Sequence, residues 1–122
     1  MKEHRTDPDL ASLLPLQPAT FHILMALGEG DRHGYGIIQD VSMRTRGGLR
    51  LSAGTLYRSV QRMLEQGLII ETRERPEPEL DDERRRYYRI TALGKAAARA
   101  EASRLRELLD LARASGFAPG KA

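Results

Sequence analysis

Hydrophobic positions recur every three or four residues in three segments of the first half of the chain, and this period is typical of amphipathic helices. The segments cover residues 18–28, 34–45 and 52–67. Each has an apolar face, so we expect three helices that pack around a shared core. The expected apolar positions are Phe21, Leu24, Met25 and Gly28 in the first helix, Ile37, Ile38 and Val41 in the second, and Leu56, Val60, Met63 and Leu64 in the third.

The ends of these segments carry residues that start and stop helices. Pro18 suits the first turn of a helix, and Ser52 can accept a hydrogen bond from the free N–H groups at the start of the third helix. Gly67 is a typical C-terminal stop. Gly34 and Gly36 weaken the first turn of the second helix, and they fit there if another group approaches the backbone closely.

After Gly67 the pattern changes to a period of two, which is the period of β-strands. Residues 68–75 and 84–91 predict two strands, joined by a polar turn region with prolines at residues 76–83. These strands are expected to pair as a hairpin. Its second strand should place Arg84, Arg86, Tyr88 and Ile90 on one face and Arg85, Tyr87 and Arg89 on the other.

A long helix is predicted from its cap, Thr91, to about Ser115. At 1.5 Å per residue this helix spans about 37 Å. One interpretation is a lid on its own domain, but a domain of this size does not need so long a cover. We therefore expect the apolar side of the helix to pair with a second copy of the chain. The expected interface residues are Leu93, Ala97, Ala100, Leu105, Leu108, Leu109 and Ala112, with Leu10, Leu13 and Leu14 as additions.

Three helices, a hairpin and a long helix, in this order, predict a winged helix-turn-helix domain with a long C-terminal dimerisation helix. The fold class is α+β and mostly helical. Residues 1–15 are expected to form an N-terminal arm with a short helical turn capped by Asp9, and residues 16–91 the winged domain. Residues 92–115 are expected to form the dimerisation helix and residues 116–122 a flexible tail.

The length and composition of the chain exclude several kinds of protein and site. The 122 residues suffice for one domain. The absence of cysteine excludes a disulfide framework and a Cys-based zinc site, and it fits a reducing compartment. No apolar run approaches the roughly 20 residues of a membrane span, and the first residues lack the apolar run of a signal peptide. We expect a cytoplasmic protein with no membrane partner.

The distribution of charge points to a partner. The net charge is only +3, but residues 41–64 contain five arginines and no acid, whereas residues 71–83 contain seven acids and two arginines. An acid-free block centred on a helix predicts contact with the phosphates of a nucleic acid. Short hydroxyl and cationic side chains also suit the major groove of DNA. On the third helix these side chains are Thr55, Arg58, Ser59 and Arg62.

Three motifs occur together in this order and spacing: HGYGI at residues 33–37, GTLYRSVQRMLEQGLI at 54–69 and DDERRRYYRITALG at 81–94. On these motifs the chain resembles the PadR family of bacterial transcriptional regulators over about residues 16–96. The resemblance implies a homodimer that binds an inverted-repeat operator in double-stranded DNA, usually as a repressor. Because the chain ends after one C-terminal helix, it resembles the short subtype of the family.

The resemblance also implies which residues face DNA. For Tyr57 two roles stay open, since its hydroxyl could contact a phosphate or its ring could close the core. The two faces of the second strand cannot both meet DNA, so one set of arginines is expected to pair with the acids at residues 77–83. The family positions are Tyr35, Ser52, Gly54, Thr55, Tyr57 and Arg58, together with Arg84, Arg85 and Arg86 of the wing.

Other functions have weaker support in the sequence. The histidines His4, His22 and His33 are scattered, and no nucleophile elbow, phosphate-binding loop or HExxH pattern accompanies them, so neither an enzyme nor a metal or cofactor site is expected. We expect His22 at the edge of the core and His33 in a capping role or at a phosphate. Some short-subtype relatives stack flat aromatic compounds on a tryptophan of the last helix. This chain has no tryptophan, so a small-molecule effector stays open but is not indicated.

The alternative class is a winged-helix module that binds protein or RNA without sequence-specific DNA binding. Proteins that recognise single-stranded RNA typically stack its bases on exposed aromatic side chains. This chain has only six phenylalanine and tyrosine residues in all, and of these only Tyr57 is expected near the proposed face. Duplex DNA is therefore the favoured ligand.

Overall fold

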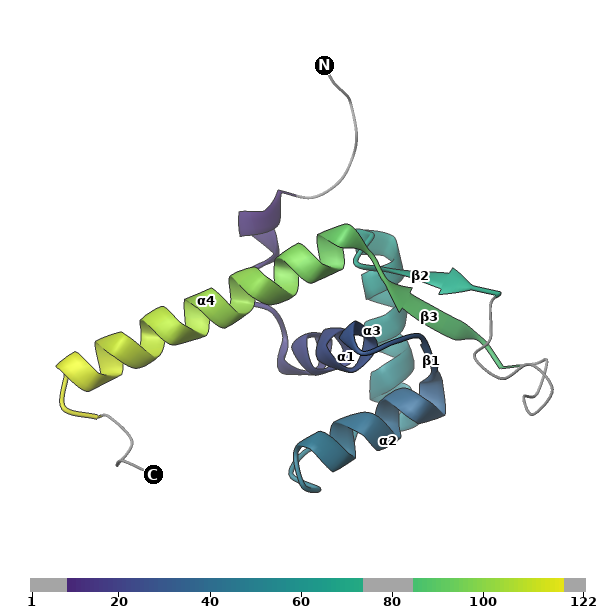
Figure 1. Ribbon diagram of the computed structural model, residues 1–122, viewed down its shortest axis with the longest axis horizontal. Helices are drawn as coiled ribbons and strands as arrows, with labels where there is room; N and C mark the ends of the chain where they lie inside the picture. Colours follow the sequence, from purple (N-terminus) through teal and green to yellow (C-terminus); the bar gives the residue numbers. More distant parts are fainter. Residues whose placement is uncertain (1–8, 74–84, 118–122) are drawn as a thin grey trace, which may run out of the picture.

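The computed structural model of the chain describes residues 9–73 and 85–117, and it contains the helices and strands in the predicted order. The three helices of the winged domain lie close together, and the last helix runs past them and extends away from the domain (Figure 1). The predicted winged helix-turn-helix is confirmed. The elements are the 3₁₀ turn η1 (Leu10–Leu13), α1 (Pro18–Gly28), β1 (Arg32–His33), α2 (Gly34–Arg44), α3 (Ala53–Gln66), β2 (Ile69–Thr72), β3 (Tyr87–Ile90) and α4 (Ala92–Ala114).

The sheet has three antiparallel strands in the order β1-β3-β2. The predicted pairing of the two wing strands is confirmed, with Ile69 opposite Ile90 and Glu71 opposite Tyr88. The third strand, β1, was not predicted, because two residues are too few to show a period. Its pairing with β3 ties the wing to the start of α2, which follows β1 directly.

The core is centred on α1, which contacts α2, α3 and α4. The predicted apolar face of this helix is right at Leu24 and in part at Phe21, which packs half-buried against the core, and it is wrong at Met25 and Gly28, which are exposed. The reason is that almost every position of α1 is apolar, so a second set of residues fits the same spacing and faces the three neighbouring helices. The buried residues of α1 are Thr20, Ile23, Leu24, Ala26 and Leu27.

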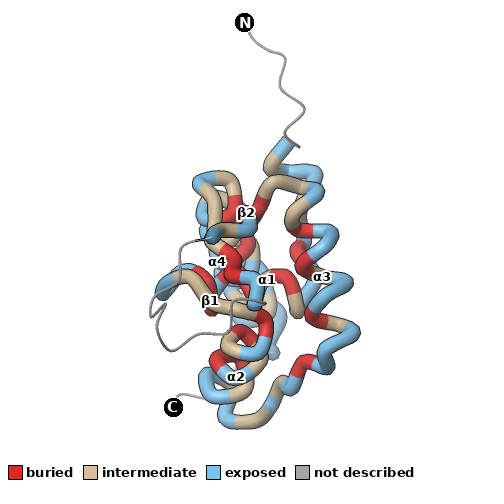
Figure 2. Tube along the Cα trace, turned by 90° about the vertical axis from the view of Figure 1, so that its right-hand side faces the viewer, coloured by how far each residue is buried: buried red, intermediate tan, exposed pale blue. Residues whose placement is uncertain are grey.

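Helix α3 begins and ends where its capping residues predicted. The Ser52 hydroxyl accepts a hydrogen bond from the Thr55 N–H at 3.1 Å, and Gly67 ends the helix in the left-handed conformation at φ 78°. Most of the predicted core positions are buried, and the outer side of the helix is largely exposed (Figure 2). The sequence pattern therefore placed both the ends and the buried face of this helix correctly.

The N-terminal arm corrects one detail of the prediction. In η1 the Asp9 side chain makes no capping hydrogen bond. Instead the Asp9 backbone carbonyl accepts from the N–H of Ser12 at 2.9 Å and from its hydroxyl at 2.6 Å, which closes the short turn without a side-chain cap. The leucines at 10, 13 and 14 are half-buried against the core of their own chain.

Helix α4 divides into a half that packs on the domain and a half that leaves it. In the first half Ala97 is fully buried in its own core, so the prediction that it contacts a partner is wrong. Farther along, Leu105, Leu108 and Leu111 are 39%, 52% and 64% exposed. Neither α4 nor any other helix in the described residues is long and apolar enough to cross a membrane.

A buried carboxylate fixes the N-terminal arm to α4. Glu101 is almost fully buried, and its Oε1 accepts from the backbone N–H of Leu16 at 3.1 Å. Arg104 binds both carboxylate oxygens, with Nε 3.0 Å from Oε1 and Nη2 2.6 Å from Oε2. The Arg104 guanidinium, followed by the Leu16 hydrogen bond, lowers the pKa of Glu101 against the opposing effect of burial.

Replacing Glu101 with glutamine is expected to lower the free energy of unfolding at neutral pH by about 2 kcal/mol, because charged hydrogen bonds at a buried site are removed. Since the pKa of the folded carboxyl is depressed, its contribution is present above the ordinary carboxyl pKa and is lost as the pH falls through the folded pKa. Urea unfolding curves of the two proteins should therefore converge in acid. The exposed Glu107→Gln on the same helix is the control, and equal stability of Glu101→Gln and the native protein at pH 7 contradicts the prediction.

Candidate nucleic-acid interface

The open face of α3 carries cations and no acid before its last turn. Arg58 and Arg62 are exposed, and Glu65 is the first carboxylate along the helix. Thr55 and Ser59, predicted on the same face, lie half-buried at its edge. The structure thus leaves the two arginines free to meet a ligand and places the two hydroxyl residues beside them.

The first turn of α3 is held by its own side chains. The Ser52 hydroxyl lies 3.1 Å from Oγ1 of Thr55, and Nη2 of Arg58 lies 3.5 Å from the same atom. The Arg58 guanidinium folds back over this turn, within van der Waals distance (3.4 Å) of a Cβ built on Gly54. These contacts place a guanidinium at the positive end of the helix dipole, beside the exposed residues Ala53 and Gly54.

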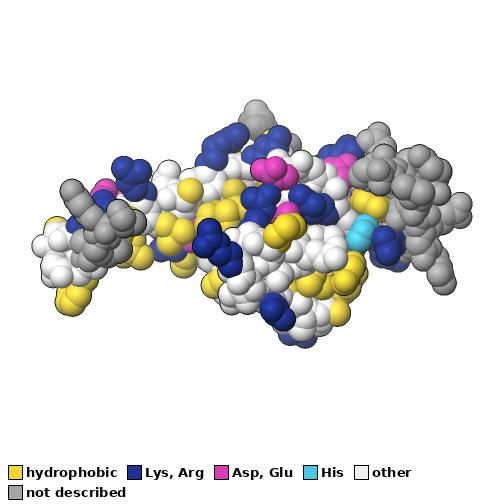
Figure 3. All heavy atoms as spheres, turned by 60° about the horizontal axis from the view of Figure 1, so that its bottom comes forward, with side chains coloured by type: hydrophobic (Ala, Val, Ile, Leu, Met, Phe, Trp, Pro, Cys, Tyr) yellow, Lys and Arg dark blue, Asp and Glu magenta, His cyan; other side chains and the backbone are white. Residues whose placement is uncertain are grey.

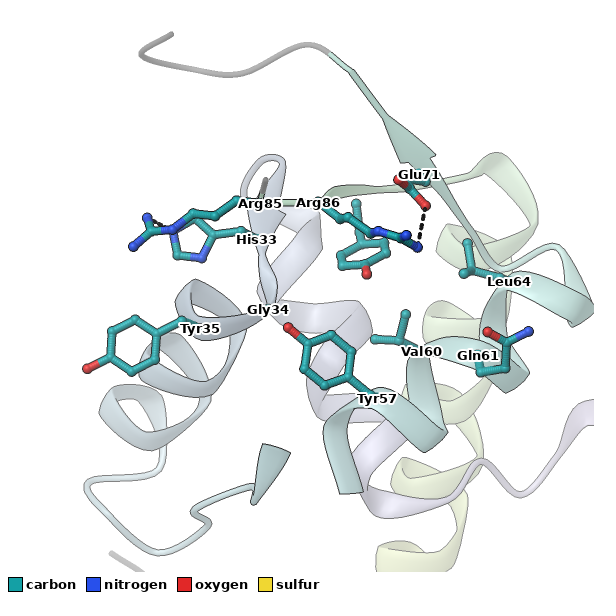
Figure 4. A pocket seen from close by; sticks show the side chains of 11 residues that line it. His33, Gly34, Tyr35, Tyr57, Val60, Gln61, Leu64, Glu71, Arg85 and Arg86 are labelled. Carbon is teal, nitrogen blue, oxygen red and sulfur yellow. Dashed lines mark hydrogen bonds and ion pairs between the residues drawn. The ribbon is translucent and has the colours of Figure 1, made fainter. Parts of the chain in front are cut away.

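A cavity of about 570 Å³ lies between the start of α2, α3 and the wing. Figure 4 shows its lining side chains, with Tyr57 rising from α3 beneath the wing and Arg85 and Arg86 above it. Tyr88 also lines the cavity, and burial, followed by Tyr57 and Glu71, raises its pKa. Its phenol therefore keeps its proton at neutral pH. The cavity thus combines two wing cations with three phenol groups, those of Tyr35, Tyr57 and Tyr88.

Tyr57 is positioned by the absence of a side chain at Gly34. A Cβ at Gly34 would lie 2.3 Å from the Tyr57 hydroxyl oxygen, so only glycine allows the ring to lie there. This is the close approach that the glycines at the start of α2 indicated. Tyr57 remains 50% exposed and Tyr35 60% exposed, so Tyr57 does not simply close the core.

His33 joins the start of α2 to the wing. Its Nδ1 accepts a hydrogen bond from the Gly36 N–H at 3.0 Å, which confirms the capping role. Its Nε2 lies 3.0 Å from Nη1 of Arg85, and its ring meets that of Tyr87 edge to face at 5.2 Å between centroids. The sequence alone gave the histidine two roles and did not connect it with the wing.

The wing arginines have different partners. Nη1 of Arg86 lies 3.8 Å from Oε1 of Glu71 on β2, and Arg89 makes a bidentate ion pair with Asp31, with contacts of 2.8 and 3.2 Å. Arg84 and the acids at residues 77–83 lie outside the described residues, so their predicted pairing stays a prediction. Arg85 and Arg86 are both exposed at the mouth of the cavity.

Comparison with known proteins identifies the family. The family model described as "Transcriptional regulator PadR-like family" matches residues 23–100. The chain belongs to the PadR-like family. It is therefore a transcriptional regulator by family and not an enzyme, which confirms the resemblance seen in the three motifs.

Two relatives are similar to this PadR-like chain in sequence. The uncharacterized protein X of Lysinibacillus sphaericus is 43% identical over 74 residues, which are 61% of this chain and 65% of that protein. The chain therefore spans slightly less than two thirds of that relative. The transcriptional regulator Rv3488 of Mycobacterium tuberculosis is 34% identical over 87 residues, which are 71% of this chain and 75% of that protein.

Two solved structures share the fold of this PadR-like chain. A PadR family transcription regulator from Clostridium difficile matches with a TM-score of 0.65 and 26% identity, over 80% of this chain and 96% of that one. Bacillus subtilis PadR, solved in complex with operator DNA, matches with a TM-score of 0.58 and 17% identity, over 69% of this chain and 46% of that one. At that identity the second likeness shows the fold alone.

Two side chains of the PadR-like interface were missed by sequence reasoning. Gln61 lies on the exposed side of α3 and lines the cavity, yet the prediction passed over it because it considered only hydroxyl and cationic side chains. Glu71 also lines the cavity. The residues around it in the sequence predict a strand with alternating charge, and they do not indicate that Glu71 belongs to the site. Its position facing α3 could be found only from the register of the wing strands.

Proposed function

We propose that this PadR-like protein is a transcriptional repressor that binds an inverted-repeat operator in duplex DNA as a homodimer. The observation that carries the proposal is the exposed α3 surface, which presents Arg58 and Arg62 and no carboxylate before Glu65. Bacillus subtilis PadR, which shares the fold, was solved with operator DNA, and this supports the choice of ligand. A steric block of a promoter is the simplest action for a protein that occupies the groove of duplex DNA with a helix.

The proposed binding mode places α3 in the major groove, which is about 12 Å wide and admits one helix. Arg58 and Arg62 would then reach base edges, as arginine does with guanine. Arg85 and Arg86 would meet the phosphates that flank the groove, because they stand across the cavity from α3. The Tyr57 hydroxyl lies between these two surfaces and would donate to a phosphate in the same stretch of backbone.

The proposed dimer uses the part of α4 that leaves the domain. Helical geometry puts Leu105 and Leu108 on the same side of α4 as the buried Ala97 and Glu101, so the apolar stripe of the helix continues past the domain that covers its first half. Figure 3 shows hydrophobic side chains along this part of α4. A second copy of the same helix offers a matching apolar stripe, and a two-fold dimer would present two α3 helices to the two halves of an inverted repeat.

Selection of bound sequences from a random duplex pool with the purified protein tests the proposal. We expect an inverted repeat with half-sites about one helical turn apart or a multiple of it. A single-stranded RNA pool is the matched control, because the exposed Tyr35 and Tyr57 are of the type that stacks on unpaired bases. Enrichment of RNA alone, or of no sequence, contradicts the proposed function, and reporter expression from a promoter carrying the selected site tests repression.

Replacing Arg85 with alanine is expected to weaken binding to the selected operator and to a random duplex by the same factor, because phosphate contacts carry no sequence information. The slope of log binding constant against log salt concentration should become shallower by about 0.9 per subunit, or about 1.8 for the proposed dimer, since each subunit leaves one phosphate no longer neutralised. Fluorescence anisotropy at several salt concentrations measures both quantities. Lys95→Ala, an exposed cation on α4, is the control, and weakening confined to the operator contradicts a phosphate contact at Arg85.

A further inference from the structure

An acidic side chain, that of Glu71, lines the cavity between α3 and the wing together with two arginines. Glu71 on β2 is the one carboxylate among the described residues that line this cavity, whose cationic lining residues are Arg85 and Arg86. Its Oε1 lies 3.8 Å from Nη1 of Arg86, and Figure 4 shows the Arg86 side chain extended across the cavity toward it. A carboxylate at this place opposes the approach of a phosphate, so it calls for an explanation.

The ion pair between Glu71 and Arg86 is one that a stronger partner can break. The side chain of Arg86 is 72% exposed and that of Glu71 45% exposed, so water and salt screen their attraction. The pair between Glu101 and Arg104 differs, because that carboxylate is buried and accepts three hydrogen bonds. Arg86 is thus held in the free protein by a contact that a DNA phosphate can replace.

We propose that Glu71 restrains Arg86 in the free protein and thereby lowers the affinity of the wing for duplex DNA. This inference rests on the proposed function. Glu71 acts as a positioning residue through Arg86: the guanidinium must leave the carboxylate before it binds a phosphate. Because the contact is with a phosphate, the restraint lowers the affinity for all duplexes alike, and it limits how long the protein stays on DNA outside its operator.

Four proteins test the restraint: the native chain, Glu71→Gln, Arg86→Ala and the double variant. We expect Glu71→Gln to bind both operator and random duplex about two- to fivefold more tightly for each wing that contacts the DNA, which is the range of an exposed ion pair. The slope of log binding constant against log salt concentration should steepen by up to about 0.9 for each such wing. In the Arg86→Ala background the same substitution should change neither quantity. Glu107→Gln on α4 removes an equal charge far from the cavity and is the matched control.

Two results overturn the inference. Unchanged or weaker binding by Glu71→Gln shows that Glu71 does not hold Arg86 back. An equal gain with and without Arg86 shows simple repulsion between Glu71 and phosphate. Elution from heparin, a polyanion without base pairs, separates this inference from the proposed function. Later elution of Glu71→Gln only when Arg86 is present supports the restraint even if no operator is found, and equal elution of all four proteins contradicts it. Circular dichroism confirms that each variant is folded.

Discussion

Replacing Leu108 with glutamate is expected to convert the protein from a dimer to a monomer and to weaken its binding to the operator strongly. Leu108 is 52% exposed in the isolated chain, so a carboxylate there is tolerated by the monomer. In the proposed α4 interface the same carboxylate would be buried against leucines without a partner, which costs several kcal/mol. A monomer binds one half-site, so it loses the gain from two linked contacts, about 100- to 10,000-fold.

Light scattering after size-exclusion chromatography measures the assembly, and anisotropy with a one-half-site and a two-half-site duplex measures the binding. Ser103→Glu is the matched control, since it introduces the same charge at an exposed position about 140° around the helix from Leu108. We expect Ser103→Glu to remain dimeric. A Leu108→Glu protein that stays dimeric at micromolar concentration places the dimer interface elsewhere on the molecule, and a native chain that is monomeric contradicts the homodimer itself.

Local signals in the sequence were sufficient to predict the main helices. Pro18, Ser52, Gly67 and Thr91 each act through backbone groups within four residues, and each starts or ends a helix where the sequence indicated. The alternation of the wing strands is a local signal as well. A capping or turn residue acts on its own neighbours whatever the rest of the chain does, so these predictions did not depend on the tertiary structure.

Contacts between distant segments could not be predicted in this way. Leu16 and Glu101 are 85 residues apart, and only the packing of the N-terminal arm on α4 brings them together. The sequence marked Ala97 as one more small residue of an apolar stripe, but the crossing of α4 over α1 decides that it is buried in its own chain. An apolar stripe does not say whether its own domain or a partner covers it.

In the candidate site, too, the local features could be predicted from the sequence and the contacts between distant segments could not. The arginines of α3 were found because a helical face without acids is visible in the sequence. The ion pair between Glu71 and Arg86 depends on the register of the two wing strands, in which Glu71 lies opposite Tyr88. The sequence between the two strands does not fix that register. The sequence therefore revealed the charge of the interface, while the structure was needed to show which charges are already paired.

Replacing both Arg58 and Arg62 with alanine is expected to remove sequence-specific binding while the fold is kept. Both side chains are exposed, so little stability is lost with them. Each arginine that reads a base edge contributes about 1–3 kcal/mol, and a dimer presents each of them twice. The double variant should therefore bind the operator no better than a random duplex, whereas its weaker binding to random DNA should be largely retained through the wing.

Competition between operator and random duplex measures this ratio directly, and it separates base recognition from phosphate attraction. Arg99→Ala, an exposed arginine on α4, is the control for the removal of positive charge, and it should leave the ratio unchanged. If the double variant still prefers the operator as strongly as the native protein does, α3 does not read the bases with this face. Specificity would then have to come from the other exposed residues of the helix, of which Tyr57 and Gln61 line the cavity beside the wing.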